Sequence, residues 1–360
     1  MSSVRQNIRN LDLQQLTEQL ENLGEKKFRA KQISEWLWKK NAHSFDEMSD
    51  LSLGLREKLK DEFYIDSLEL KTKQISRDRT VKCAFSVMEN RIVEGVLIPT
   101  SKRMTACISS QIGCSLACEF CATGKLKLLR NLTPGEIVDQ VVFLRNEAIQ
   151  LYGINLSNIV LMGMGEPLLN YKNVLSALEH ISSENGLGIS PRRITLSTAG
   201  ISKMIKKLAD DEVKFNLALS LHAANDTKRN KIMEINESNN LNSLIEALVY
   251  FHEKTNTRIT LEYILLKDFN DSIEDAQELL TFAKNFPCKI NLIEYNSIDH
   301  VPFKSSDSYK VDTFIAFLES KNVVVNLRRS RGKDIDAACG QLANKNDSIK
   351  LENRELKKDL

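Results

Sequence analysis

The stretch Cys114-Ser115-Leu116-Ala117-Cys118-Glu119-Phe120-Cys121 places three cysteines within eight residues, spaced by four and then by three. This spacing is compatible with one face of a helix, so one interpretation is a buried apolar stripe in which cysteine acts as a small hydrophobic residue. A structural zinc site normally needs four ligands, and the chain has no second Cys-x-x-Cys pair to complete one. Three thiolates on a cubane iron–sulfur cluster leave one iron open to a small molecule, which favours a catalytic cluster.

The composition sets the broad class of the protein. The chain has 360 residues, of which 42% are hydrophobic and 27% charged, as in a globular protein with one main core and a small accessory domain. Seven cysteines, an odd number, do not suggest a disulfide framework. The N-terminus is polar, and no apolar stretch approaches the roughly 18 residues that a membrane helix needs. We therefore expect a cytoplasmic protein with no membrane partner.

The formal net charge of +2 does not by itself indicate a nucleic-acid partner. Two local groups of basic residues are the candidates for such a surface: Lys26, Lys27, Arg29, Lys31, Lys39 and Lys40, and then Arg328, Arg329, Arg331 and Lys333. Each group is compatible with an RNA-binding surface and equally with an ordinary solvated surface.

The pattern of apolar residues divides the chain into four parts. Residues 1–66 show helical spacing and predict a small helical accessory domain, a candidate for RNA binding. Residues 67–100 change to alternating, β-branched runs on either side of Glu89-Asn90, which predicts a connecting β-hairpin of residues 80–88 and 91–98. Residues 101–342 alternate short apolar runs with amphipathic helices, and residues 343–360 form a charged tail.

The alternation over residues 101–342 predicts an α/β fold with a parallel sheet. The expected strands are 105–109, 158–162, 193–196, 215–219, 259–265, 289–293 and 323–327. Thr133-Pro134-Gly135-Glu136 combines a capping box with proline at the first helical position, which predicts the start of a helix. Because these units are fewer than the eight of a closed barrel, we expect a partial, open β/α barrel.

The residues that follow the expected strands are informative, because ligands of parallel β/α folds bind at the carboxyl ends of strands. The candidates are Gly165, Glu166, Ser197, Ser220, Leu221, His222 and Asn296. Serines at such positions also cap helices, and a lone histidine is often structural. The shared location of these residues at one edge of the sheet nevertheless favours a cofactor-binding site.

The spacing Cys-x3-Cys-x2-Cys, with an aromatic residue before the last cysteine, resembles the cluster-binding loop of the radical-SAM superfamily. Further stretches resemble the RlmN/Cfr family of radical-SAM RNA methyltransferases: VEGV at 93–96, CISSQIGC at 107–114, MGMGEP at 162–167, SLHA at 220–223 and GKDIDAACGQL at 332–342. The resemblance implies a partial barrel of the radical-SAM type. It also implies that Cys114, Cys118 and Cys121 hold a [4Fe-4S] cluster and that the strand-end residues bind S-adenosyl-L-methionine (SAM), used twice per turnover.

The resemblance assigns roles to three residues outside the cysteine motif. Cys339 would accept a methyl group from the first SAM, and a radical made from that group with the second SAM would add to an adenine ring. Glu94 would accept the proton that the ring carbon loses. Cys107 would then attack the Cys339 sulfur, release the RNA and leave a disulfide for an external reductant. Without the resemblance, Cys107 and Cys339 would be taken as buried core residues and Glu94 as a solvent-facing strand residue.

The substrate implied by the resemblance is an adenosine of 23S ribosomal RNA and, for some members, transfer RNA. An electron donor such as flavodoxin with its reductase is also implied, and we expect a monomer. Glu166-Pro167 resembles the members that methylate carbon 2 of adenine, whereas the carbon-8 type usually has alanine after the glutamate. Two alternatives stay open: carbon-8 methylation of the Cfr type, and a non-catalytic RNA-binding protein with a structural iron–sulfur cluster.

Overall fold

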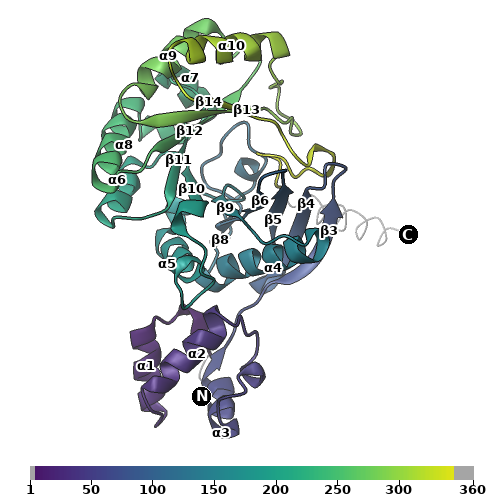
Figure 1. The fold of residues 1–360 in the computed structure, drawn as a ribbon, viewed down its shortest axis with the longest axis vertical. Helices are drawn as coiled ribbons and strands as arrows, with labels where there is room; N and C mark the ends of the chain where they lie inside the picture. The colour runs from purple at the N-terminus through teal and green to yellow at the C-terminus, as the bar shows by residue number, and fades with distance from the viewer. Residues whose placement is uncertain (1–4, 344–360) are drawn as a thin grey trace.

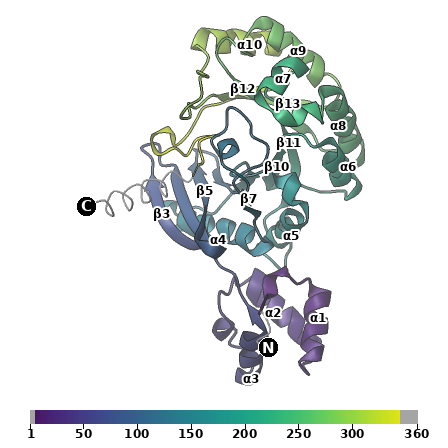
Figure 2. The same ribbon diagram turned by 180° about the vertical axis from the view of Figure 1, so that it is seen from behind.

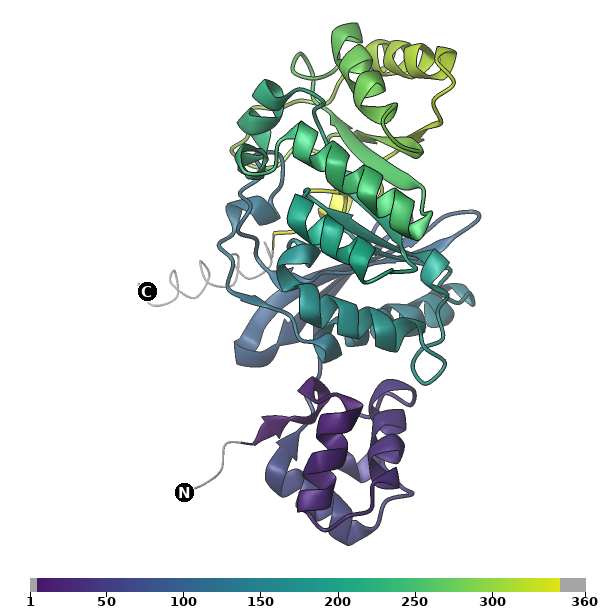
Figure 3. The same cartoon turned by 90° about the vertical axis from the view of Figure 1, so that its left-hand side faces the viewer.

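The computed structural model describes residues 5–343, so nearly all of the tail expected at 343–360 lies outside the described residues. Residues 5–66, here called the N-terminal unit, form the helical part seen at one end of the molecule in Figures 1 and 3. Its elements are β1 (Gln6–Asn7), η1 (Ile8–Asn10), α1 (Leu13–Asn22), α2 (Phe28–Trp38), η2 (Phe45–Glu47), α3 (Leu53–Glu62) and β2 (Phe63–Tyr64). The three expected helices are therefore present.

Local sequence explains where these helices begin. The side chain of Asp12 accepts from Gln15 N at the start of α1, and the Gln15 side chain accepts in return from Asp12 N, which is a capping box. Ser52 caps α3 by accepting from Leu55 N. Helix α2 has no side-chain cap and depends on the apolar face that it buries, with Ile33 and Leu37.

Residues 67–100 form a three-stranded antiparallel meander: β3 (Glu69–Ile75), β4 (Val81–Val87) and β5 (Arg91–Pro99). The predicted hairpin is confirmed, and its turn places Glu89 and Asn90 in the left-handed region, at φ 64° and 55°. The meander is not a separate connector, however, because β5 pairs antiparallel with the first barrel strand in the register Val96↔Cys107. Backbone pairing along β5 thus joins the meander to the main sheet.

The main sheet has ten strands in the order β14-β13-β12-β11-β10-β9-β6-β5-β4-β3. Its parallel strands are β6 (Met104–Cys107), β9 (Asn158–Leu161), β10 (Ile194–Thr198), β11 (Asn216–Ser220), β12 (Ile259–Leu265), β13 (Cys288–Glu294) and β14 (Val325–Arg328). The sequence therefore predicted every parallel strand to within a few residues, and the partial β/α barrel is confirmed.

Helices follow most of these strands and cover the outer face of the curved sheet (Figures 1 and 2). They are α4 (Pro134–Tyr152), α5 (Tyr171–Ser182), α6 (Ser202–Asp210), α7 (Asp226–Ile232), α8 (Leu241–Thr255), α9 (Ile273–Ala283) and α10 (Ser308–Ser320). The short helical turns are η3 (Met88–Asn90), η4 (Thr123–Lys125), η5 (Pro167–Asn170), η6 (Pro191–Arg193), η7 (Glu234–Glu237) and η8 (Lys333–Ile335). None of the described helices is long and apolar enough to cross a lipid bilayer.

Helix α4 begins as the sequence predicts. Thr133 and Glu136 form a reciprocal capping box, with Pro134 at the first helical position. The side chain of Glu136 is fully buried and also binds Arg130, at 2.7 and 2.8 Å. This double use of one carboxylate fixes the start of α4 against the segment that follows the cysteine motif.

The segment after β14, residues 329–343, is called the strap because it crosses from one end of the sheet toward the other (Figure 2). Gly332 N donates to Asp78 Oδ2 at 2.9 Å, while Asp334 accepts from Ser76 Oγ at 2.5 Å and from Arg77 N at 3.1 Å. These contacts tie the strap to the β3–β4 turn and so bridge the open side of the partial barrel.

Candidate active site

A cavity of about 620 Å³ opens at the carboxyl ends of the parallel strands, where ligands of this fold class bind. It is lined by the loop after β6, the loops after β9 to β11 and the strap, and also by strand side chains such as Val96 of β5, Glu262 of β12 and Arg328 of β14. Of the predicted site residues, ten line this cavity: Cys107, Cys114, Cys118, Cys121, Gly165, Glu166, Ser197, Ser220, His222 and Cys339.

Residues 114–121, the cysteine loop, form no helix, so the helical-stripe interpretation of the three cysteines is wrong. The loop lies between the two strands of a short antiparallel pair, β7 (Gln111–Ile112) and β8 (Arg130–Asn131). Gly113 has φ 77°, and a Cβ there would overlap the carbonyl of Lys127. Only glycine suits this position, because the residue is both left-handed and pressed against backbone. The loop thereby turns its three partly exposed thiols toward the cavity.

The donor set of the cysteine loop fits an iron–sulfur cluster. Among residues 5–343, no three cysteine, histidine or carboxylate side chains converge on one point as the ligands of a single metal ion do. A cubane cluster binds each thiolate through a different iron, so its ligands stand further apart than those of one ion. Three thiolates and an adjoining cavity also leave room for a small molecule at the remaining iron.

Burial raises the pKa of the Cys114 thiol to about 11, and burial together with the neighbouring thiols raises that of Cys118 well above its usual value. Thiols in such surroundings become thiolates when a metal cation binds, since coordination removes the proton. The loop therefore suits a resident metal group rather than a free, reactive thiolate.

Glu166 connects the loops that follow β9 and β10. It is 3% exposed, and its two carboxylate oxygens accept from Leu168 N at 3.0 Å and Ala199 N at 2.7 Å. Burial raises the pKa of this carboxyl. Gly165, just before it, has φ 94° and lies so close to Gln111 that any Cβ would overlap that side chain. The Gly-Glu pair thus brings the backbone of this loop against the base of the cysteine loop.

Ser197 and Ser220 end neighbouring strands, and their hydroxyls lie 3.2 Å apart on the cavity wall. His222 is also buried, and its Nδ1 accepts from Ile264 N at 3.1 Å. Burial, followed by the charge of Arg229, lowers the pKa of His222 to about 3, so the ring is neutral near pH 7. The ring packs edge-on against Phe120 of the cysteine loop, with centroids 4.7 Å apart. His222 therefore supports the loop that carries the thiols.

The strap brings Cys339 to the same cavity. Cys339 is exposed, not buried as the residue types around it suggested, and its carbonyl accepts from Asn296 Nδ2 at 3.3 Å. The strap is also held just after Cys339: Ala122 N donates to Gly340 O at 2.7 Å, and Thr123 Oγ1 donates to Leu342 O at 2.6 Å. The cysteine loop and the segment bearing Cys339 are therefore in direct contact.

Cys107 ends β6 and lines the cavity, although it is only 8% exposed. Burial, and then the nearby Cys339 thiol, raise the pKa of Cys107 to about 12. All seven cysteines are free thiols in this structure, so the disulfide expected between Cys107 and Cys339 is not formed. Two thiols that are distant in the sequence nevertheless share one cavity.

Three of the expected site residues lie behind the cavity wall. Glu94 is fully buried, which corrects the expectation of a solvent-facing residue, and its carboxylate lies 3.3 Å from Lys82 Nζ and accepts from Ala343 N at 3.0 Å. Leu221 is fully buried, and its backbone carbonyl accepts from Arg229 Nε at 3.0 Å. Asn296 is 4% exposed and touches the strap backbone.

Two charged residues of the cavity were missed or misjudged from the sequence. Glu262 of β12 is 2% exposed and binds Arg328 of β14 at 3.1 Å and Asn291 Nδ2 at 2.8 Å. The signal was present, because a glutamate in the middle of an otherwise apolar strand needs a buried partner. Arg328 belongs to the C-terminal basic group, and it lines the cavity rather than an outer surface.

Similarity to known proteins agrees with this architecture. A model of the ribosomal RNA large subunit methyltransferase N-terminal domain matches residues 6–65, and the radical SAM superfamily model matches residues 108–282. A protein of Cytophaga hutchinsonii, described as a probable dual-specificity RNA methyltransferase RlmN, is 55% identical over 93% of this chain and 92% of its own. The chain belongs to the RlmN family of radical-SAM RNA methyltransferases.

A second RlmN relative, from Christiangramia forsetii, is 54% identical over 95% of this chain and 97% of its own. The crystal structure of a radical SAM methyltransferase from Sphaerobacter thermophilus matches with a TM-score of 0.87 and 36% identity, covering 93% of this chain and 98% of that one. The family resemblance predicted from the sequence motifs is thereby confirmed. Membership in the RlmN family also favours an enzyme over a non-catalytic RNA-binding protein.

Proposed function

We propose that this chain methylates carbon 2 of an adenine in 23S ribosomal RNA, with Cys339 as the carrier of the methyl group. The observation that carries the proposal is the meeting of Cys107, Cys339 and the cysteine loop at one cavity. An adenine ring carbon is a poor nucleophile, so a methyl group has to reach it as a carbon radical. A thiol that faces the cluster-binding loop is suited to hold that carbon while the radical forms.

The residues of the cavity divide the chemistry between them. Cys114, Cys118 and Cys121 would hold the [4Fe-4S] cluster, which together with bound SAM supplies one-electron chemistry. Cys339, exposed on the strap, would take up the methyl group as a thioether and present its carbon to the adenine. Once the carbon–carbon bond has formed, the adduct would give up its odd electron to the cluster, which spent one electron on SAM, and its ring proton to a base. Cys107, as a thiolate, would then attack the Cys339 sulfur, so that the S–S bond forms as the sulfur–carbon bond breaks. The bond pair would stay on the carbon, which takes up a proton and becomes the methyl group. An external thiol then reduces the disulfide and restores both cysteines.

Glu94 is the proposed acceptor of the proton that leaves the adenine carbon. In the described structure Lys82 neutralises its charge, and the backbone of Ala343 covers it. The role therefore requires that the end of the strap shift away from Glu94 when RNA binds.

SAM is proposed to bind along the strand ends, twice in each turnover. The cavity is lined by Gly165, Ser197, Ser220 and His222. The Glu166 carboxylate accepts two backbone hydrogen bonds and has further lone pairs with which it could accept from SAM. Leu221 and Asn296 would act from behind the wall, by shaping the β11 loop and by holding the Cys339 carbonyl.

The macromolecular partners belong to the same proposal. The N-terminal unit, with its exposed lysines at 26, 27, 31, 39 and 40, would bind RNA through the phosphate backbone. Transfer RNA is a proposed second substrate, since the relatives are described as dual-specificity enzymes. We further propose a monomer that receives electrons from a flavodoxin and its reductase.

Nucleoside analysis tests the proposal. The anaerobically reconstituted protein is incubated with ribosomal RNA, SAM and a low-potential reductant, and the digested RNA is examined by mass spectrometry. We expect 2-methyladenosine. Finding only 8-methyladenosine would contradict the choice of carbon. A reduced cluster whose electron paramagnetic resonance signal is indifferent to SAM would contradict the enzymatic role itself.

A further inference from the structure

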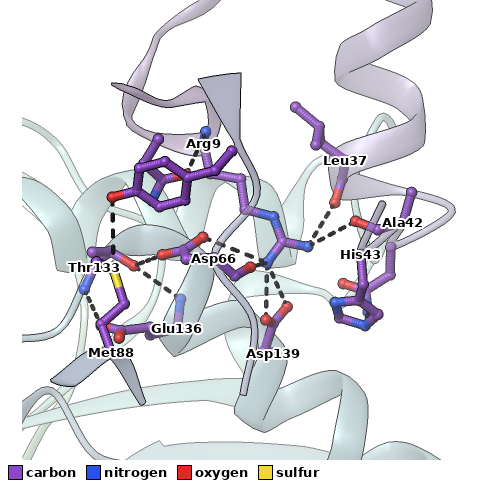
Figure 4. A network of polar contacts seen from close by, with 12 residues as sticks. Arg9, Leu37, Ala42, His43, Asp66, Met88, Thr133, Glu136 and Asp139 are labelled. Carbon is purple, nitrogen blue, oxygen red and sulfur yellow. Dashed lines mark hydrogen bonds and ion pairs between the residues drawn. The ribbon is translucent and has the colours of Figure 1, made fainter. Parts of the chain in front are cut away.

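The contact between the N-terminal unit and the barrel is built around one buried arginine (Figure 4). The side chain of Arg9 is 0% exposed, and its Nη1 donates to both carboxylate oxygens of Asp139 on α4, at 2.8 and 2.9 Å. The same guanidinium donates within the N-terminal unit to the carbonyl of Asp66 at 3.1 Å and to those of Leu37 and Ala42 at 3.5 Å. Arg9 therefore joins three segments of the unit to one helix of the barrel.

Two further contacts surround this arginine. Trp38, at the end of α2, stacks on His180 of α5 with ring centroids 3.7 Å apart and planes within 4° of parallel. Thr133 Oγ1 donates to Asp66 Oδ2 at 2.6 Å. Gly135 of α4 packs against Asp66 and Arg9, since a Cβ at this position would stand 2.6 Å from Asp66 Oδ1 and 2.7 Å from Arg9 Cδ. Such close packing on two helices at once does not permit the unit to swing freely.

Helix α4 also reaches the active site. Gln140, next to Asp139, accepts from Ser109 N at 2.9 Å and donates to Ser109 O at 3.1 Å. Ser109 Oγ in turn donates to Glu94 O at 2.6 Å and accepts from Met164 N at 2.7 Å. The helix that receives Arg9 is thus bonded to the base of the cysteine loop and to the β9 loop. The unit is fixed to the part of the barrel that holds the site.

We propose that Arg9, acting through Asp139, is a positioning residue that holds the N-terminal unit at a fixed distance from the active site, so that the unit acts as a ruler. The enzyme would then select folded RNA in which an unpaired adenine lies at a set distance from a base-paired stem bound by the unit. The proposal rests on the proposed function and adds a substrate class to it. The exposed lysines in and beside α2, at 26, 27, 31, 39 and 40, would contact phosphates without reading sequence, so that their contribution to selection is geometric. Because the N-terminal unit is rigidly joined to the barrel, RNAs with a different distance between stem and adenine would bind less well.

Two changes test the link in the full-length, cluster-loaded enzyme. Asp139→Asn keeps the shape of the side chain and removes its charge. The pair Arg9→Met with Asp139→Leu removes both charges of this ion pair. Asp66, whose carboxylate lies 3.9 Å from Arg9 Nη1, keeps the hydrogen bond that it accepts from Thr133. Lys228→Met is the matched control, because it breaks another ion pair with a buried carboxylate, Asp275, at 2.6 Å and away from the N-terminal unit.

Three measurements separate positioning from general damage. For a stem–loop RNA with an unpaired adenine, we expect KM to rise at least about tenfold in both test variants, since small misplacements far from the chemistry are costly. Methylation of Cys339 within the enzyme in the absence of RNA, measured on the digested peptide that contains this residue, is expected to match the wild type. Small-angle X-ray scattering is expected to show a larger radius of gyration in both test variants. Lys228→Met is expected to behave as wild type in all three.

Wild-type KM and scattering in both test variants would overturn the ruler. Equal losses with and without RNA would also overturn it, since they indicate general damage to the barrel. If the wild type fails to methylate any RNA, the proposed function is wrong, whereas the scattering comparison still decides whether Arg9 fixes the unit.

Discussion

The cysteine loop and the strap face one cavity, but they are held there in different ways. The loop takes its path from local backbone, with Gly113 and Ala117 in the left-handed region and Cys121 N donating to Cys118 O at 3.2 Å. The strap is held by groups remote in the sequence, such as Asp78 at one end and Thr123 at the other. Ligands that stay on one metal group can be placed locally. In the proposed mechanism the Cys339 thiol meets a methyl donor, an RNA base and a second thiol in turn, and a segment whose contacts can open one at a time suits that role.

The largest effect is expected in the cysteine loop. Cys118→Ala removes one of the three proposed cluster ligands, so iron and sulfide content and all SAM-dependent reaction are expected to fall to background. Cys288→Ala is the matched control, because Cys288 is half-buried on β13 and does not line the cavity. A Cys118 variant with full iron content and turnover would show that the loop is not the cluster site.

The strap cysteine is expected to fail at one step only. Cys339→Ala should retain the iron and sulfide content of the wild type and lose RNA methylation entirely, because the proposed methyl carrier is gone. Metal analysis and nucleoside mass spectrometry on the same preparation measure both properties. Sustained methylation of RNA by this variant would contradict the proposal that the strap carries the methyl group while the loop carries the cluster ligands.

A smaller effect is expected from loosening the anchor of the strap. Asp334→Asn weakens its contacts with Ser76 Oγ and Arg77 N, so the strap should open more often and kcat should fall by a few fold. Hydrogen exchange of residues 332–343 should rise while that of the cysteine loop stays unchanged. Asp307→Asn serves as the control, since Asp307 pairs with Lys267 outside the strap. Unchanged exchange in the strap would show that Asp334 is not an anchor.

The smallest effect is expected in how folding stability changes at low pH, through His222. Burial lowers the pKa of His222 to about 3, so on acidification the unfolded chain takes up a proton near pH 6.5 while the folded chain does not. Folding stability should therefore fall below pH 6.5, by about 1 kcal/mol at pH 5.5 from this residue. His222→Asn, which suits the left-handed backbone at φ 58°, should remove that part of the decline in urea unfolding.

The strap anchor should respond at lower pH. Hydrogen bonds from Thr80 and from Gly332 N outweigh burial and lower the pKa of Asp78 to about 2. Its contribution to stability is therefore fully present above pH 3.8 and is lost as the pH falls toward 2. Between pH 7.5 and 5.5 the protection of residues 332–336 should stay constant after correction for intrinsic exchange rates. Loss of that protection in this range would contradict the assignment of Asp78 as an ionised anchor.

The sequence predicted features that depend on short-range patterns and missed those that depend on tertiary contact. The capping box at Thr133 and the glycines around Glu166 are local signals, and both lie where expected. The burial of Glu94 was not predicted, because nothing near it in the sequence reveals Lys82 opposite or the strap above it. Arg9 gave no signal at all, since a lone arginine in a short turn acquires its role only when Asp139 is packed against it.

The most direct test of the mechanism is the Cys107→Ala enzyme, because this variant lacks the thiol that is proposed to separate RNA from protein but keeps Cys339, the proposed methyl carrier. After incubation with RNA, SAM and reductant, nuclease digestion and peptide mapping should find an adenosine joined through a methylene carbon to the Cys339 sulfur. Release of methylated RNA at the wild-type rate, with no RNA on Cys339, would contradict the carrier mechanism.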